Sequence, residues 1–197
     1  MKPYLLGIDI GTSACKVAVF EKSGTVVAAA NGDYPVYYPK EGWAEQNPEE
    51  WWSAVCQAVK KVIEKAGIQP EEIAGIGIDG QSWSAIAMDK DGNVLTNTPI
   101  WMDTRAQSIC DRLNEEIGAD QIFEVSGNSL QPSYTTAKIL WYKENLPEVY
   151  EKIDKILQSN SYIAYKLTGV MSQDVSQGYG LHCFDTVSYT HLTLPTK

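Results

Sequence analysis

Short apolar runs separated by turn residues open the chain. Residues 4–10, 16–20 and 25–30 are rich in β-prone side chains, and glycine-containing turns lie between them. Runs of this length, bounded by turn signals, are typical of β-strands. Because the connections are short, the pattern predicts an antiparallel meander of three strands at one edge of a sheet.

A helical periodicity replaces this pattern after a loop rich in tyrosine and proline. Asn47 precedes Pro48 and two glutamates, and apolar residues then recur every three or four positions as far as Gly67. Asparagine caps helices, proline suits the first helical position, and glycine suits the position after the last turn. The pattern predicts one long helix, followed at residues 73–79 by a buried strand in which apolar and small residues alternate.

Shorter elements are predicted for the rest of the chain. A strand at residues 84–88 precedes a helix that Asp103 would cap and Gly118 would end. A second helix opens at residue 135 or 136 and stops before Pro147, and a short helix, a strand and a further helix follow between residues 148 and 167. No repeat, low-complexity tract or linker interrupts the series. The 197 residues are enough for one ordinary domain or slightly more.

Composition and charge narrow the classes of function. The chain is 44% hydrophobic and 21% charged, which is ordinary for a globular protein, and its net charge is −9. Because no basic cluster interrupts this acidic balance, we expect neither nucleic acid nor an anionic membrane as a partner. No apolar run approaches the roughly 20 residues of a membrane helix, and the N-terminus does not resemble a signal peptide. We therefore expect a cytoplasmic protein.

Few side chains are available for metal or triad chemistry. The four cysteines are far apart and form no CxxC pair, which fits reduced thiols better than a disulfide framework or a zinc site. The two histidines, His182 and His191, both lie near the C-terminus. A serine–histidine–aspartate triad or a histidine-based metal site is therefore not expected over most of the chain.

The best candidate for chemistry is the turn after the first strand. Its residues are Asp9, Gly11, Thr12 and Ser13, with Lys16 three positions further on. Glycine lets a phosphate approach the backbone amides, the two hydroxyls add donors, and the lysine adds positive charge if strand alternation brings it to the same side. The aspartate is suited to hold Mg²⁺. The structural alternative is a β-hairpin turn that uses aspartate and glycine for conformational reasons alone.

Two further segments offer hydrogen-bonding and aromatic side chains. They contain Gln81, Ser82 and Trp83 in one case, and Trp101, Asp103 and Arg105 in the other. The first segment follows a predicted strand, where α/β folds place ligand groups, and an indole presents a flat face to the C–H side of a sugar. The structural alternatives are a turn with a core tryptophan, and a helix-capping aspartate paired with an arginine. A tryptophan-rich segment at residues 42–52 is either a helix start with core aromatics or a loop that supports a sugar pocket.

Taken together, the segments resemble the N-terminal domain of the FGGY family of carbohydrate kinases, with a pattern closest to xylulokinases. The resemblance covers residues 4–185 and rests on several motifs at family-like spacing, which are GIDIGTS at 7–13, GWAEQNPEEWW at 42–52, IGIDGQ at 76–81, PIWMDTR at 99–105, AKILW at 137–141 and YKLTG at 165–169. It implies an actin-like ATPase (ribonuclease H-like) fold. That fold is α/β, with a mixed sheet that begins with the N-terminal β-meander and is flanked by helices.

The resemblance also implies a reaction and a set of sites. The reaction is transfer of the γ-phosphoryl group of ATP to a sugar hydroxyl, which requires alignment, charge neutralisation by Mg²⁺ and a base. The residues implied at the phosphates of Mg-ATP are Asp9, which is also the metal ligand, Gly11, Thr12, Ser13 and Lys16. Those implied at the sugar are Gln81, Ser82, Trp83, Trp101, Asp103 and Arg105. The expected partners are a small-molecule sugar and ATP, and a homodimer of the full-length protein is left open.

The sugar segment departs from the family patterns, and this bears on the substrate. Glycerol kinases carry Gln-Arg-Glu and xylulokinases carry Gln-Met-His where this chain has Gln81, Ser82 and Trp83. Glycerol is therefore disfavoured, and another ketose or polyol, such as ribulose, stays an alternative to xylulose. A function from a different class, a non-catalytic actin-like nucleotide-binding scaffold or regulator, is the second hypothesis.

Length is the largest departure from the family. The catalytic base of the family is an aspartate in its second half, and this chain has no matching segment. Residues 186–197 do not resemble the family and look like translated adapter or vector sequence. We therefore expect residues 1–185 to be the N-terminal kinase domain, residues 186–197 to be a non-native tail, and the chain to be a fragment that is nearly inactive alone.

Overall fold

The computed structural model describes residues 3–182, 184–185 and 190–191. Residues 190–191 form β10 (Thr190–His191), which pairs with β9 (Phe184–Asp185). The other residues of the expected non-native tail lie outside the described part of the chain. No helix among the described residues is both long enough and apolar enough to cross a membrane.

The described residues form two compact units. The first, here called the sheet unit, contains residues 3–36, 46–81 and 159–171. The second, here called the helical unit, contains residues 37–45 and 82–158 and the described residues from 172 onward. Each unit has a buried apolar core of its own.

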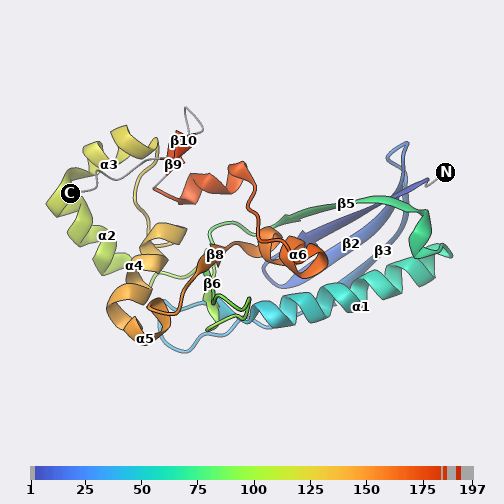
Figure 1. Ribbon diagram of the computed structural model, residues 1–197, viewed down its shortest axis with the longest axis horizontal. Helices are drawn as coiled ribbons and strands as arrows, with labels where there is room; N and C mark the ends of the chain where they lie inside the picture. Colours follow the sequence, from blue (N-terminus) through green and yellow to red (C-terminus); the bar gives the residue numbers. More distant parts are fainter. Residues whose placement is uncertain (1–2, 183, 186–189, 192–197) are drawn as a thin grey trace. The chain divides into compact units, whose positions relative to one another are not determined.

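A four-stranded mixed sheet forms the sheet unit, in the order β3-β2-β1-β5. The strands β1 (Tyr4–Ile10), β2 (Ala14–Glu21) and β3 (Val26–Asp33) are antiparallel neighbours, which confirms the predicted meander. The fourth strand, β5 (Ile73–Gly80), runs parallel to β1. Figure 1 shows the four strands side by side, with α1 running along β2 and β3.

The long helix α1 (Pro48–Ala66) forms as its capping residues predict. The Asn47 side chain accepts a hydrogen bond from the Glu49 amide at 3.0 Å, and Gly67 ends the helix with φ 66°. The buried face of α1, with Trp51 among its residues, packs on β2 and β3. A second helix, α6 (Ser159–Thr168), packs against β5 and α1. Both helices thus contribute to the core of the sheet unit.

Residues 73–79 form a strand as predicted, but the prediction that this strand is buried is wrong. Strand β5 forms, but all eight of its residues are half-exposed or exposed, and Ile76 is 47% exposed. Among the described residues, β5 pairs with β1 alone and is therefore an edge strand. A parallel strand with this apolar composition is usually covered on both faces. The sequence of β5 therefore predicts a covered strand, whereas the described residues leave it partly exposed.

Helices dominate the helical unit. They are α2 (Gln107–Leu113), the π-helical turn η2 (Asn114–Gly118), α3 (Ala119–Ser126), α4 (Thr135–Asn145) and α5 (Pro147–Tyr150). A short antiparallel pair, β6 (Ile86–Met88) and β8 (Lys155–Leu157), lies in the same unit. The remaining short elements among the described residues are β4 (Glu45–Gln46), η1 (Pro70–Glu72), β7 (Thr98–Pro99) and η3 (Val175–Gly180). The core includes Ala85, Ile109, Ala137, Trp141 and Tyr142.

Two predicted helix boundaries in the helical unit are wrong. Asp103 does not cap α2, which begins after Ala106, because the Asp103 carboxylate accepts hydrogen bonds from the backbone amides of Ala44 and Arg105 instead. Gly118 does not end the helical region. It interrupts it with φ 98°, and the chain continues as α3.

The Asn47 cap gives a direct test of the sheet unit. Replacement of Asn47 by alanine leaves the Glu49 amide without its side-chain acceptor, so we expect the free energy of unfolding to fall by about 1 kcal/mol. Asn47→Asp keeps an acceptor and should retain most of the stability. Urea unfolding followed by far-ultraviolet circular dichroism measures both, and equal losses in the two variants would contradict the capping role.

Candidate functional site

A tight turn joins β1 to β2 and contains the candidate phosphate-binding residues. The Gly11 amide donates a hydrogen bond to the Ala14 carbonyl at 3.1 Å, which closes the turn. A Cβ atom on Gly11 would lie only 2.9 Å from the same carbonyl oxygen, so this position requires glycine. The Tyr34 hydroxyl donates to the Gly11 carbonyl at 2.6 Å. The turn is therefore fixed by its own backbone and by a side chain from the end of β3.

Gln46 is the buried residue that ties this turn to other parts of the sheet unit. Its side-chain Nε2 donates to the carbonyls of Thr12 (2.8 Å) and Pro35 (3.1 Å), and its Oε1 accepts from Gln81 Nε2 at 2.8 Å. Gln46 is fully buried. Because the carbonyls of Gly11 and Thr12 accept hydrogen bonds from Tyr34 and Gln46, the negative ends of two peptide dipoles are already neutralised by donors of the protein. That arrangement favours an anion at the turn.

Sequence reasoning did not assign a role to Gln46. It lies within the segment at residues 42–52, for which the sequence predicts a helix start or a supporting loop. The signal available was only its position in the motif GWAEQNP. Gln81, a predicted sugar-binding residue, donates a hydrogen bond to the side-chain amide oxygen of Gln46. The two glutamines therefore form a hydrogen-bonded pair next to the turn.

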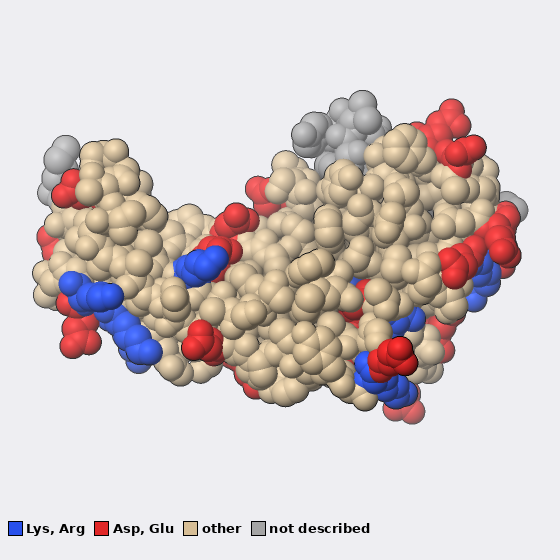
Figure 2. Space-filling model, turned by 180° about the vertical axis from the view of Figure 1, so that it is seen from behind, with Lys and Arg blue, Asp and Glu red and all other residues tan. Residues whose placement is uncertain are grey.

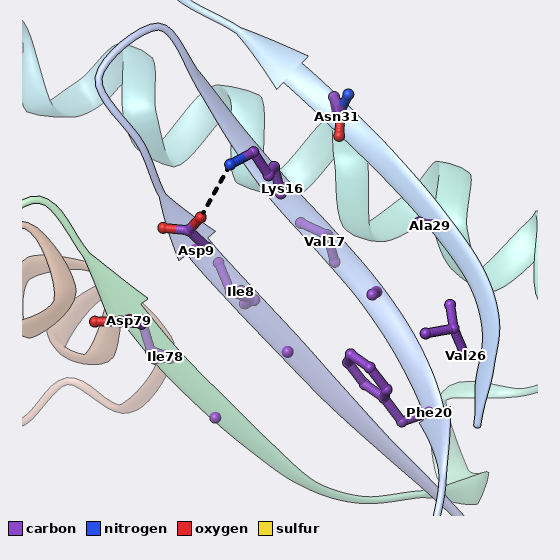
Figure 3. Close-up of a pocket in the computed structure, with 13 residues that line it drawn as sticks. Ile8, Asp9, Lys16, Val17, Phe20, Val26, Ala29, Asn31, Ile78 and Asp79 are labelled. Carbon is purple, nitrogen blue, oxygen red and sulfur yellow. Dashed lines mark hydrogen bonds and ion pairs between the residues drawn. The ribbon is translucent and has the colours of Figure 1, made fainter. Parts of the chain in front are cut away.

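Asp9 and Lys16 face each other across β1 and β2. They are direct partners in the antiparallel register, and Lys16 Nζ lies 3.4 Å from Asp9 Oδ2 (Figure 3). The side chains are 46% exposed for Asp9 and 70% exposed for Lys16. The alternation of β2 therefore brings Lys16 to the side of Asp9, as the phosphate-site hypothesis requires. An ion pair this exposed contributes little to stability, so both groups remain accessible to a ligand.

Asp79 lies on the other side of Asp9; it begins the candidate segment at residues 79–83, but sequence analysis gave it no role of its own. It is the register partner of Asp9 in the parallel pairing of β1 with β5, and Figure 3 shows the two carboxylates on neighbouring strands. The Gly80 amide donates to Asp79 Oδ1 at 2.8 Å. Carboxylate oxygens are the ligands that Mg²⁺ takes together with water and phosphate. The donor chemistry at Asp9 and Asp79 therefore fits this cation.

In the part of the chain that the structure describes, no group of three or more histidine, cysteine, aspartate or glutamate residues is placed so that it could hold a metal ion. A cation at Asp9 would therefore need oxygen atoms beyond those of the protein. Mg²⁺ usually retains several waters and binds with one or two carboxylates plus substrate phosphates. The residues at the turn fit a cation that arrives with a polyphosphate better than a resident metal ion.

A pocket of about 660 Å³ extends from Asp9 and Lys16 along the sheet. Its polar end is formed by Asp9, Lys16, Asn31 and Asp79, and Phe20 and Val26 line its apolar part (Figure 3). On the face of the molecule seen in Figure 2, acidic and basic side chains are scattered and form no broad basic surface. Lys16 is the one basic residue among those that line the pocket, so the positive charge available to an anion at this end comes from Lys16 and from backbone dipoles.

The predicted pair of Asp103 and Arg105 forms a buried ion cluster in the helical unit. Arg105 Nε donates to both carboxylate oxygens of Asp103 at 2.9 Å, and Arg105 Nη2 lies 2.8 Å from Glu45 Oε2. The guanidinium stacks over the rings of Trp43 (3.8 Å to the centroid) and Trp141 (5.0 Å). Burial lowers the pKa of Arg105, but its hydrogen bonds to the two carboxylates outweigh this and raise the pKa above its usual value.

This geometry bears out the salt bridge that sequence analysis offered as the structural alternative for Asp103 and Arg105. Asp103 is fully buried, and both of its oxygens accept hydrogen bonds from the protein. Direct contact of these two residues with a sugar stays a prediction. Trp101, from the same motif, is 43% exposed and presents part of its ring at the surface.

Lys138 is a second buried cation of the helical unit, and sequence reasoning gave it no role. Its Nζ donates to the carbonyls of Trp83 (2.7 Å) and Ser133 (2.6 Å). Burial lowers the pKa of Lys138 to about 7; the carboxylate of Asp103 acts in the opposite direction, and Arg105 reinforces the lowering. The only signal in the sequence was its place in the motif AKILW.

Loss of the Gln46 bridge should destabilise the sheet unit. Gln46→Leu removes the hydrogen bonds that Gln46 makes to the Thr12 and Pro35 carbonyls and to the Gln81 amide, so we expect the free energy of unfolding to fall by about 2–3 kcal/mol. Gln57→Leu, at an exposed position of α1, is the matched control and should change it by less than about 0.5 kcal/mol. Chemical denaturation measures both, and a Gln46 variant as stable as the control would contradict the bridging role.

The lowered pKa of Lys138 predicts a pH dependence of stability. Between pH 7 and 8.5 the unfolded chain keeps the Lys138 proton while the folded chain loses it, so the unfolded state binds more protons and stability rises with pH. We expect a rise of about 1 kcal/mol over this interval. Lys138→Met should lose the rise and Lys143→Met, exposed on the same helix, should keep it.

Denaturant midpoints at several pH values between 7 and 8.5 provide the measurement. The other groups with shifted pKa values change the free energy of unfolding mainly outside the range from pH 7 to 8.5. Burial lowers the pKa of His182, so its effect lies below pH 6.5, and burial raises the pKa of Cys15 and Cys110 above 9. An identical pH profile in the unmodified chain and the Lys138→Met variant would show that Lys138 remains protonated.

Comparison with known proteins relates this geometry to a family. Residues 4–189 match the model of the N-terminal domain of the FGGY family of carbohydrate kinases. The xylulose kinase of Bacillus subtilis (strain 168) is 34% identical over 90% of this chain and 35% of its own length. The glycerol kinase of Thermococcus gammatolerans is 32% identical over 89% of this chain and 36% of its own length.

Solved structures show the same relationship. The crystal structure of a ligand-bound xylulose kinase from Lactobacillus acidophilus superposes with a TM-score of 0.88 at 30% identity, over 95% of this chain and 38% of that chain. This similarity confirms the predicted fold class, an α/β domain with a mixed sheet. The chain spans little more than a third of the length of the proteins it matches.

Proposed function

Because the chain belongs to the FGGY family of carbohydrate kinases, we propose that it is the N-terminal sugar- and phosphate-binding part of an ATP-dependent sugar kinase. The reaction proposed for the full-length protein is transfer of the γ-phosphoryl group of ATP to a sugar hydroxyl. The observation that carries the proposal is the β1–β2 turn, whose carbonyls accept hydrogen bonds from Tyr34 and Gln46 while Asp9 and Lys16 lie together beside it.

The turn supplies groups for the polyphosphate of ATP. We assign phosphate binding to Gly11, whose lack of a side chain admits close approach, to the hydroxyls of Thr12 and Ser13, and to Lys16. Asp9 is assigned to Mg²⁺, with Asp79 as the neighbouring carboxylate. A bound Mg²⁺ would neutralise part of the negative charge on the phosphates. The residues of the turn would fix where the phosphates and the cation lie.

The sugar is assigned to the segments around Gln81 and Trp101. Gln81 and Ser82 offer hydrogen bonds, and Trp83 and Trp101 offer flat faces for C–H groups. The relatives include both xylulose kinases and glycerol kinases. We favour a ketose such as xylulose, because Ser82 and Trp83 replace the charged pair of glycerol kinases, and ribulose or another polyol is the alternative. The cytoplasm, where ATP and phosphorylated sugars are found, is the proposed location.

Nucleotide binding tests the phosphate assignment. We expect Asp9→Asn to weaken binding of Mg-ATP to the chain at least tenfold, equivalent to about 1.4 kcal/mol, because the carboxylate that meets the cation is lost. Asp91→Asn, at an exposed turn of the helical unit, should leave affinity unchanged. Isothermal titration calorimetry with ATP and excess Mg²⁺ measures both.

Two results would contradict the phosphate assignment. Equal affinities in the Asp9 and Asp91 variants would remove Asp9 from the site, and a lack of Mg-ATP binding by the unmodified chain would show that the turn is no phosphate site by itself. Titration of tryptophan fluorescence with ketoses separates the kinase from a non-catalytic scaffold. A chain that binds Mg-ATP but responds to no sugar would favour the scaffold.

A further inference from the structure

Trp83 has an unusual backbone conformation. Its φ is 68°, and it is the only non-glycine residue with positive φ in the part of the chain that the structure describes. For a bulky residue the left-handed region brings Cβ too close to the backbone, so the conformation is costly. Such strain persists only where the surroundings over-determine it, and it concentrates at functional sites.

Two fully buried side chains hold the backbone of Trp83 from opposite ends. Gln158 Oε1 accepts a hydrogen bond from the Trp83 amide at 2.7 Å, and Lys138 Nζ donates to the Trp83 carbonyl at 2.7 Å. Each of these two side chains makes a second hydrogen bond to the backbone. Gln158 Nε2 donates to the Gln177 carbonyl at 3.0 Å, and Lys138 Nζ donates to the Ser133 carbonyl at 2.6 Å.

The indole of Trp83 lies in an aromatic cluster. It meets the ring of Tyr134 edge-on, with 4.8 Å between centroids, and the ring of Tyr179 lies 6.5 Å away. A Cβ atom on Gly180 would clash with Trp83 Cδ1, so the absence of a side chain there makes room for the indole. Lys138 also binds the carbonyl of Ser133, the residue before Tyr134. One lysine thus fixes the backbone at Trp83 and beside the ring that packs against it.

Space filling alone does not account for a lysine at position 138. A buried lysine loses hydration, and burial lowers its pKa to about 7. A methionine of similar length would fill the same volume without that cost. The groups that Lys138 faces are the two carbonyls, with the charges of Asp103 and Arg105 of the same unit acting on it from further away. What the lysine adds over an apolar residue is the pair of hydrogen bonds.

We propose that Lys138 and Gln158 are positioning residues that hold Trp83 in its left-handed conformation and so set the orientation of its indole in the sugar site. The inference rests on the proposed function where it concerns the sugar. It adds two residues, 55 and 75 positions from Trp83 in sequence, that are not themselves assigned to the sugar. They act through the Trp83 backbone.

The test compares the Lys138→Met variant with Lys143→Met in the complete 197-residue chain. The Trp83 contribution to the near-ultraviolet circular dichroism spectrum is defined as the difference between the unmodified chain and Trp83→Phe. We expect Lys138→Met to fold, to lose at least half of that contribution, and to raise the apparent Kd for D-xylulose, from fluorescence quenching, at least fivefold. Lys143→Met should change neither quantity more than twofold.

The Gln158→Met variant tests the second positioning residue, and Gln131→Met, at an exposed position, is its control. Gln158→Met replaces Lys138→Met as the test if Lys138→Met does not fold. A folded Lys138 or Gln158 variant with an unchanged Trp83 signal would overturn the proposal. Failure of both variants to fold would also overturn it, because it would assign the two residues to the stability of the unit as a whole. Loss of the Trp83 signal in a chain that responds to no sugar would support the positioning role and reject the sugar assignment.

Discussion

The amide side chain of Gln46 holds together three parts of the sheet unit that are distant in sequence. It donates to the carbonyls of Thr12 and Pro35 and accepts from Gln81. This amide adds to the internal hydrogen bond of the β1–β2 turn and to the Tyr34 hydroxyl, because the Thr12 carbonyl accepts its hydrogen bond from Gln46. With those carbonyls turned toward protein donors, an anion can approach the turn without meeting their negative ends. The phosphate-site proposal therefore depends on a residue that need not touch the phosphate.

The helical unit uses two buried cations in different ways. Arg105 lies between the carboxylates of Asp103 and Glu45 and keeps its charge, as the raised pKa indicates. Lys138 is hydrogen-bonded to two carbonyls, and its pKa falls to about 7. Dipoles compensate the loss of hydration less than opposite charges do. The first group stabilises the surroundings of Trp43 and Trp141, whereas the second shapes the backbone at Trp83.

Strand β5 shows a disagreement between local sequence and environment. Its alternation of isoleucines with small residues suits a strand buried on both faces, yet within the described part of the chain it forms an edge with Ile76 at the surface. The same strand carries Asp79 beside Asp9 and leads into Gln81. Its position next to β1 is therefore decisive for the site, because the parallel register brings the ends of two strands, and their polar residues, to one edge of the sheet.

The sequence by itself determined the meander, α1 with both of its caps, α4 and the family. These features depend on periodicity, capping residues and motifs that extend over a few neighbouring positions. Tertiary structure decided the edge position of β5, the role of Gln46, the ion cluster of Asp103 with Glu45 and Arg105, and the backbone of Trp83. Gln46 reaches a carbonyl 34 positions away and Lys138 one 55 positions away. The partner of a buried polar group is set by which elements pack together, and no local pattern records that choice.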